Sequence, residues 1–175
     1  MSRTKLKKSL ASFGEPELRQ LIFDIYDKNK DVRELLDFYA EPDLDRKLDE
    51  YEQRADKEIF RVRRRAHRPR MSEIRRLIAR FKSFEPGDEY IGRLRLHIAI
   101  GLAGLGTTDF LPRTVNESAE KFLRETVGYL AEHNMLADSL PRLSKAADNM
   151  RPKIGLYDNP LRSSLKRIIE DYSGK

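Results

Sequence analysis

The stretch "EPDLDRKLDEYEQRADKEIF", residues 41 to 60, has the clearest helix pattern in this chain. Its apolar residues follow one another after four, three, four and four positions, so they fall on one side of a helix. The positions between them are polar or charged, with eight acidic and four basic residues over 41–58. The pattern predicts an amphipathic helix that Pro42 opens and that buries Leu44, Leu48, Tyr51, Ala55 and Ile59.

Helix signals of the same kind recur on the N-terminal side of this stretch. A short first helix is expected to end near Gly14, and Pro16 suits the start of a second. The second helix carries the apolar stripe Leu18, Leu21, Ile22 and Ile25. A third helix follows "DKNKD", and its predicted buried face is Val32, Leu35, Leu36 and Tyr39.

On the C-terminal side the periodicity predicts four or five more helices. One starts after Pro69 with Ser72 as its N-cap, and another runs from Pro86 to about Leu105. The last is capped by Asn159 and opened by Pro160. The apolar positions of these helices include Ile74, Leu77, Ile78, Phe81, Leu94, Ile98, Leu102, Phe122, Leu123, Leu165 and Ile168.

Eight to nine helices with short connections favour antiparallel helix hairpins. The sequence therefore predicts an all-α fold, either a helical bundle or a short right-handed α-α superhelix. A chain of 175 residues suits a single all-helical domain over 1–175. A subdivision into 1–60 and 71–175, joined by a basic connector at 61–70, is a possible alternative.

Two segments carry a resemblance to a known family. The segment "TKLKKSLASFGEPELRQLIFDIYDKNKDVRELLDFYAEPD" at 4–43 resembles the opening of a family of small bacterial proteins of unknown function. "MSEIRRLIARFKSFEP" at 71–86 is similar to the central basic helix of that family. The resemblance covers about half of the chain. It implies an all-helical fold and carries no activity or catalytic residue.

Composition excludes several classes of site. The chain has no cysteine, so disulfides, thiolate metal sites and cysteine nucleophiles are ruled out, and a cytoplasmic protein is expected. The most apolar run, at 96–106, is too short to cross a bilayer, so no membrane contact is predicted. The histidines and the Ser-x-x-Lys at 163–166 lack the partner motifs of known catalytic sites. We predict no catalytic, metal or cofactor-binding residue, although an enzyme is left open.

The positive charge of the chain is concentrated in one region. "RVRRRAHRPR" at 61–70 holds six arginines and no acid, and residues 60–82 carry ten cations against one anion, Glu73. That region carries +9, whereas the whole chain carries +6. Clustered cations are what binding to a polyanion requires. The candidate polyanion-binding residues are Arg61, Arg63, Arg64, Arg65, Arg68, Arg70, Arg75, Arg76 and Arg80.

The acidic helix at 41–58 offers another interpretation, since it could neutralise these arginines within the fold or in a homodimer. The amphipathic helices and the lack of a catalytic constellation favour a helical interaction or adaptor module that binds a protein partner or itself. The alternative is a non-specific nucleic-acid-binding protein, or a small subunit of a nucleoprotein complex, that uses the arginine cluster at 61–80.

Overall fold

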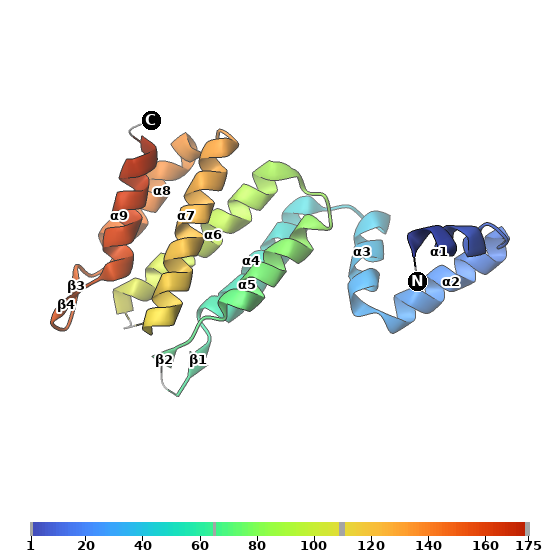
Figure 1. Ribbon diagram of the computed structural model, residues 1–175, viewed down its shortest axis with the longest axis horizontal. Coiled ribbons are helices and arrows are strands. Elements are labelled where there is room, and N and C mark those ends of the chain that lie inside the picture. Colours follow the sequence, from blue (N-terminus) through green and yellow to red (C-terminus); the bar gives the residue numbers. More distant parts are fainter. Residues whose placement is uncertain (1, 65, 109–110, 174–175) are drawn as a thin grey trace. The chain divides into compact units, whose positions relative to one another are not determined.

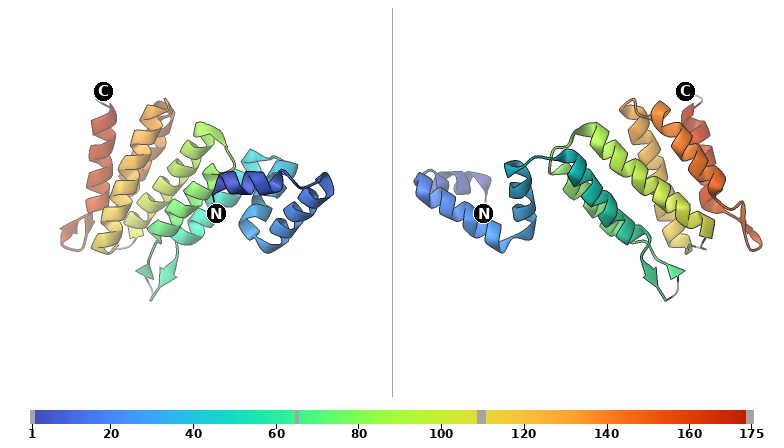
Figure 2. Two further views of the ribbon diagram at one scale, coloured as in Figure 1. Left: turned by 45° about the vertical axis from the view of Figure 1, so that its right-hand side comes forward. Right: turned by 180° about the vertical axis from the view of Figure 1, so that it is seen from behind.

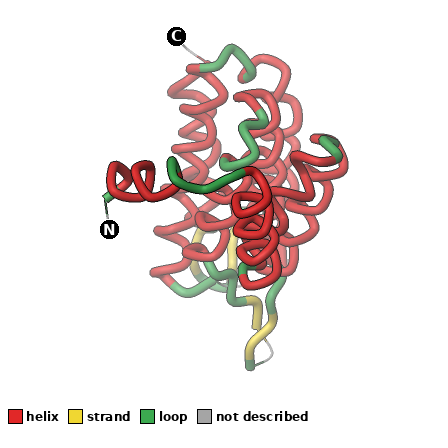
Figure 3. The backbone as a smooth tube through the Cα atoms, turned by 90° about the vertical axis from the view of Figure 1, so that its right-hand side faces the viewer, coloured by secondary structure: helices red, strands yellow, loops and turns green. Residues whose placement is uncertain are grey.

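A computed structural model describes residues 2–64, 66–108 and 111–173. These residues form nine α-helices and two short β-hairpins, so the predicted all-α fold is confirmed (Figures 1 and 3). In chain order the elements are α1 Arg3–Leu10, α2 Glu15–Lys28, α3 Lys30–Ala40, α4 Leu44–Ile59, β1 Val62–Arg63, β2 Ala66–His67, α5 Met71–Lys82, α6 Gly87–Thr108, α7 Arg113–Glu132, α8 Leu136–Asn149, β3 Lys153–Ile154, β4 Tyr157–Asp158 and α9 Pro160–Ser173.

The chain divides into two compact units, Met1–Asp43 and Leu44–Lys175. In the first unit α2 packs against α3, and polar contacts fix their hairpin. The Arg33 guanidinium donates to the carbonyl oxygens of Tyr26 and Asp27 at 3.2 and 3.0 Å. The Tyr26 hydroxyl donates to an Asp37 carboxylate oxygen at 2.8 Å. The basic connector at 61–70 lies inside the second unit, and the single-domain expectation stays a prediction.

The second unit consists of three helix hairpins stacked in two layers. Helices α4, α6 and α8 pack side by side in one layer, and α5, α7 and α9 form the other (Figures 1 and 2). Each pair of consecutive helices runs antiparallel, as the short connections predict. The handedness of a superhelix stays a prediction.

The core of the second unit lies between these layers. The predicted face of α4 is fully buried at Leu48, Tyr51, Ala55 and Ile59. The Tyr51 ring packs against Phe81 of α5, with ring centroids 5.2 Å apart. Helix α6 contacts helices of both layers, which explains why its residues 91–105 are apolar around most of the helix.

The predictions for four residues were wrong. Helix α5 begins at Met71, and the Arg70 carbonyl already accepts the Ile74 N–H at 3.0 Å, so Ser72 lies in the first turn and is not the N-cap. In α3 the buried residue is Phe38, and Tyr39 is 60% exposed because one residue turns a helix by about 100°. Ile22 and Ile25 of α2 are also exposed, because neither α1 nor α3 covers that side of the helix.

Candidate functional site

The arginine segment at 61–70 forms a β-hairpin that leads into α5. Strands β1 and β2 are antiparallel, with Val62 opposite His67 and Arg63 opposite Ala66. The Arg68 N–H donates to the Arg61 carbonyl at 2.8 Å and extends the pairing. Arg64, at the turn, has a φ of 53°. Arg63 and Arg64 are exposed, and Arg65 lies outside the described residues.

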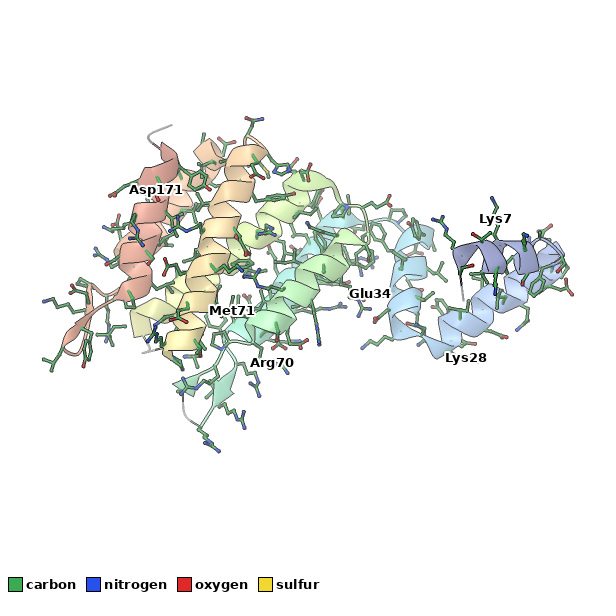
Figure 4. The ribbon with its side chains drawn as sticks, viewed as in Figure 1. Lys7, Lys28, Glu34, Arg70, Met71 and Asp171 are labelled. Carbon is green, nitrogen blue, oxygen red and sulfur yellow. The ribbon has the colours of Figure 1, made fainter. Side chains whose placement is uncertain are left out.

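The base of this hairpin is held by the acidic helix α4. Arg70, labelled in Figure 4 where the hairpin meets α5, donates through Nε and Nη2 to the two carboxylate oxygens of Glu58, each at 2.6 Å. These hydrogen bonds hold the pKa of the Glu58 carboxyl below its usual value. The Phe60 and His67 rings meet edge to face, with centroids 6.4 Å apart. Arg70 is therefore part of a structural contact.

The three predicted arginines of α5 differ in their surroundings. Arg75 donates to Glu125 of α7 at 2.6 Å, and Arg76 donates to Glu73 of its own helix at 3.0 Å. Arg80 is half-buried. The eight candidates that the structure describes thus divide between a hairpin and a helix, and Arg70, Arg75 and Arg76 have carboxylate partners. Binding of a polyanion by the set stays a prediction.

A second cationic feature was missed from the sequence. Between α5, α6 and α7 lies an open hollow of about 190 Å³, which we call the α5–α7 hollow; it is lined by Arg75, Ile78, Ala79, Lys82, Arg95 and Phe122. Arg95 lies between Leu94 and Leu96 in the apolar helix α6. The position of Arg95 is a signal that the sequence alone offers. A cation within an apolar helix must either contact a neighbouring helix or extend away from the apolar surface, because burying an unpaired charge is unfavourable.

Two of the three histidines, His97 and His133, lie at contacts between helices, where His133 is 3.5 Å from Asp88 of α6. His97 of α6 lies 2.8 Å from Asp56 and 3.5 Å from Glu52, both on α4. His133 follows the last turn of α7 and stacks on Tyr129, with ring centroids 4.1 Å apart. The described part of the chain contains no group of three or more His, Asp or Glu side chains that could hold a metal ion.

The first unit has an unusual distribution of apolar side chains. Among its described residues, Phe38 is the one that is buried. Six large apolar or aromatic side chains are each at least 41% exposed, and we call them the N-terminal apolar residues: Leu6, Phe13, Ile22, Phe23, Ile25 and Tyr39. The sequence predicted Ile22, Ile25 and Tyr39 as core residues, because they fall on periodic apolar stripes. Such a stripe does not reveal which molecule covers it.

No helix among the described residues has the length and apolarity to cross a membrane. No curated protein and no solved structure matches the chain. The sequence model of one family, a family of unknown function named DUF6155, matches residues 1–153, which include both of the segments that carry the resemblance described above. The chain therefore belongs to the DUF6155 family.

Proposed function

We propose that this protein is a helical interaction module that binds a protein partner through its N-terminal unit, and that the partner is a second copy of the same chain. The observation that carries the proposal is the exposure of the six N-terminal apolar residues. Clustered exposed apolar surface is typical of protein interaction sites.

The two units differ in how they use their apolar residues. In the described part of the second unit the large apolar side chains are buried or half-buried, except at or beside the two hairpins, where Phe60, Val62, Leu156 and Tyr157 are exposed. The first unit has only 43 residues, which is in the size range where a chain segment rarely supplies a sufficient core by itself. A further surface that covers α1–α3 would supply the missing burial.

The charges of the first unit favour a second copy as that surface. Helix α1 contains Arg3, Lys5, Lys7 and Lys8 and no acid. Residues 30–43 carry five acids against two bases. A twofold contact needs a patch that is complementary to itself, and opposite charges on the same small unit provide this. Helix α1 of one copy would lie near residues 30–43 of the other.

The test compares two exposed apolar positions in the full-length chain. Phe23→Glu changes a side chain that is 61% exposed in the first unit, and Leu156→Glu changes one that is 96% exposed at the β3–β4 turn. By size-exclusion chromatography with light scattering, we expect dimers of the parent and of Leu156→Glu, and monomers of Phe23→Glu, since a buried charge opposes the contact. A dimer that survives Phe23→Glu, or is equally lost in Leu156→Glu, would place the contact elsewhere.

A second candidate function is non-specific binding of nucleic acid by the β1–β2 hairpin. It is favoured by the exposure of Arg63 and Arg64, for which the described residues provide no carboxylate partner at ion-pair distance. Contacts to phosphates release counterions, so affinity for any oligonucleotide would fall steeply with added salt.

The test of this second function replaces Arg63, Arg64 and Arg65 together by glutamate. We expect weak binding of labelled single- and double-stranded oligonucleotides at low salt, and its near abolition by the triple change. The control reverses three exposed arginines elsewhere in the second unit, Arg113, Arg142 and Arg151, and alters net charge equally. No binding at low salt, or an equal loss in the control, would exclude the hairpin as a nucleic-acid site.

A further inference from the structure

We infer that the α5–α7 hollow is an oxyanion site that takes a phosphate group. Two helices bring cations to it, and a third supplies an aromatic side chain. Arg75 and Lys82 are seven residues apart on α5 and share a face, and Arg95 approaches from α6. Phe122 of α7 forms an apolar wall. This site is separate from the N-terminal unit and does not depend on the proposed self-association.

Arg95 is the central residue of the site. Its guanidinium lies against the Phe122 and Tyr129 rings, 5.8 and 5.0 Å from their centroids. The Nε and Nη1 atoms are buried, and neither finds a hydrogen-bond acceptor among the described residues. A buried hydrogen-bond donor that has no acceptor destabilises a folded protein, and the effect is larger when the donor is charged. Burial also lowers the pKa of this guanidinium. Arg95 therefore lacks an acceptor that an entering anion would supply.

The charge balance of the hollow favours an anion with two negative charges. Arg75, Lys82 and Arg95 bring three positive charges. The Glu125 carboxylate, 2.6 Å from Arg75, contributes one negative charge. The remaining charge of +2 matches a phosphate monoester or inorganic phosphate, which carries nearly two negative charges at neutral pH. The Phe122 side chain makes one side of the hollow apolar, and charges interact more strongly beside an apolar surface than in bulk water.

The size of the hollow also suits a single phosphate group. A volume of about 190 Å³ corresponds to roughly six water molecules in the liquid. Guanidinium groups can donate two parallel hydrogen bonds to one phosphate, and lysine adds a mobile point charge. Since the hollow is open on one side, the rest of a phosphorylated molecule can extend into solvent.

Glu125 acts as an internal competitor in this arrangement. Its carboxylate is the anion that Arg75 binds in the described structure, and it also interacts electrostatically with Arg95. A phosphate that enters the hollow must share these cations with it. Removal of this negative charge should therefore tighten phosphate binding, whereas removal of a cation should weaken it.

The experiment titrates the full-length protein with inorganic phosphate while sodium chloride keeps the ionic strength constant. Binding is followed by the NMR signal of the Arg95 Nε–H group and by the melting temperature. We expect a saturable change. Lys82→Met, at an exposed position, should weaken affinity about tenfold, since a charge-assisted contact is lost. Arg95→Met should abolish binding, and Lys82→Met remains informative if that variant fails to fold.

The matched control is Arg76→Met, which removes a cation from the same helix at a position paired with Glu73 and outside the hollow. We expect its affinity to stay within about twofold of the parent, since this charge lies outside the hollow, is paired with Glu73 and is screened by salt. Glu125→Gln should bind phosphate several-fold more tightly.

Glycerol phosphate in place of inorganic phosphate distinguishes the two sources of the phosphate group. Tighter binding of the ester indicates a phosphorylated small molecule, and tighter binding of the free ion indicates phosphate itself. Two results would overturn the inference. One is that phosphate gives no saturable change beyond that given by chloride, and the other is that Arg76→Met and Lys82→Met lose equal phosphate affinity.

Discussion

At the scale of single residues, Asn159 connects local and long-range structure. Its side chain is almost completely buried. The Oδ1 atom accepts the Arg162 N–H at 3.1 Å and caps α9, while the Nδ2 group donates to the Gly106 carbonyl of α6 at 2.9 Å. Its own N–H donates to the Pro152 carbonyl at 2.9 Å. One side chain thus fixes the start of α9 against the end of α6.

Replacement of Asn159 by alanine should lower the free energy of unfolding by about 2–3 kcal/mol, because it removes a cap and leaves the Gly106 carbonyl without this donor. Urea denaturation followed by circular dichroism measures the change. Asn29→Ala is the matched control, since Asn29 also caps a helix, α3, but is exposed. We expect about 1 kcal/mol or less for the control. Equal effects of the two changes would mean that the bond to Gly106 adds nothing.

The sequence predicted that Asn159 caps the last helix, but not that it contacts α6. Asn followed by Pro is a local signal for a helix start, so the cap and the opening Pro160 are both confirmed. The hydrogen bond to Gly106 joins residues 53 positions apart, and no local pattern indicates such a partner. Arg95 was missed for a similar reason: its surroundings come from α7, and only the fold brings them together.

At the scale of elements, the β1–β2 hairpin forms in a segment whose own sequence gives only weak signals for a hairpin, and a tertiary contact holds it. The sequence predicted a connector, because Pro69 and six like charges oppose a helix. It contains neither the alternation nor the Asn-Gly type of turn that indicates a hairpin. Its strands have only two residues each. The contact of Arg70 with Glu58 at the base supplies the order that the local sequence lacks.

Replacement of Glu58 by glutamine should loosen this hairpin. Because the Arg70 side chain is half exposed, its ion pair with Glu58 stabilises the hairpin by roughly 0.5–1 kcal/mol, so local opening should become about two- to fivefold more frequent. Limited trypsin digestion at neutral pH measures this as faster cleavage within 61–68, where the arginines lie. Glu73→Gln removes another arginine partner, that of Arg76, and should leave the rate unchanged. An unchanged rate in Glu58→Gln would show that the pair does not anchor the hairpin.

The same pair predicts a pH dependence. The pKa of Glu58 is lower in the folded protein than in the unfolded chain, so the contact stabilises the hairpin above the unfolded value, near 4.3. This stabilisation is lost as the pH falls through the lower, folded pKa. Amide exchange at Arg68, whose N–H is bonded to Arg61, should therefore lose protection at acidic pH in the parent. In Glu58→Gln the protection should be lower at neutral pH and lack this acidic step.

At the scale of the whole molecule, the helices and the core of the second unit follow from periodicity alone. The stripe of α4 and the apolar positions of α5, α6, α7 and α9 are largely buried where the sequence predicts. Each of these helices has neighbours within the same unit to cover its stripe. The stripe of α2 has the same spacing, yet Ile22 and Ile25 stay exposed. Periodicity predicts that a face will be covered, but it does not identify the molecule that covers it.

The central claim is that a second copy of this chain covers the N-terminal apolar residues. Sedimentation equilibrium of the unmodified full-length protein over a wide concentration range tests it most directly, because mass is read without variants or labels. Self-association predicts a mass that rises with concentration from 20.5 kDa toward twice that value. A mass of 20.5 kDa at every concentration would contradict it.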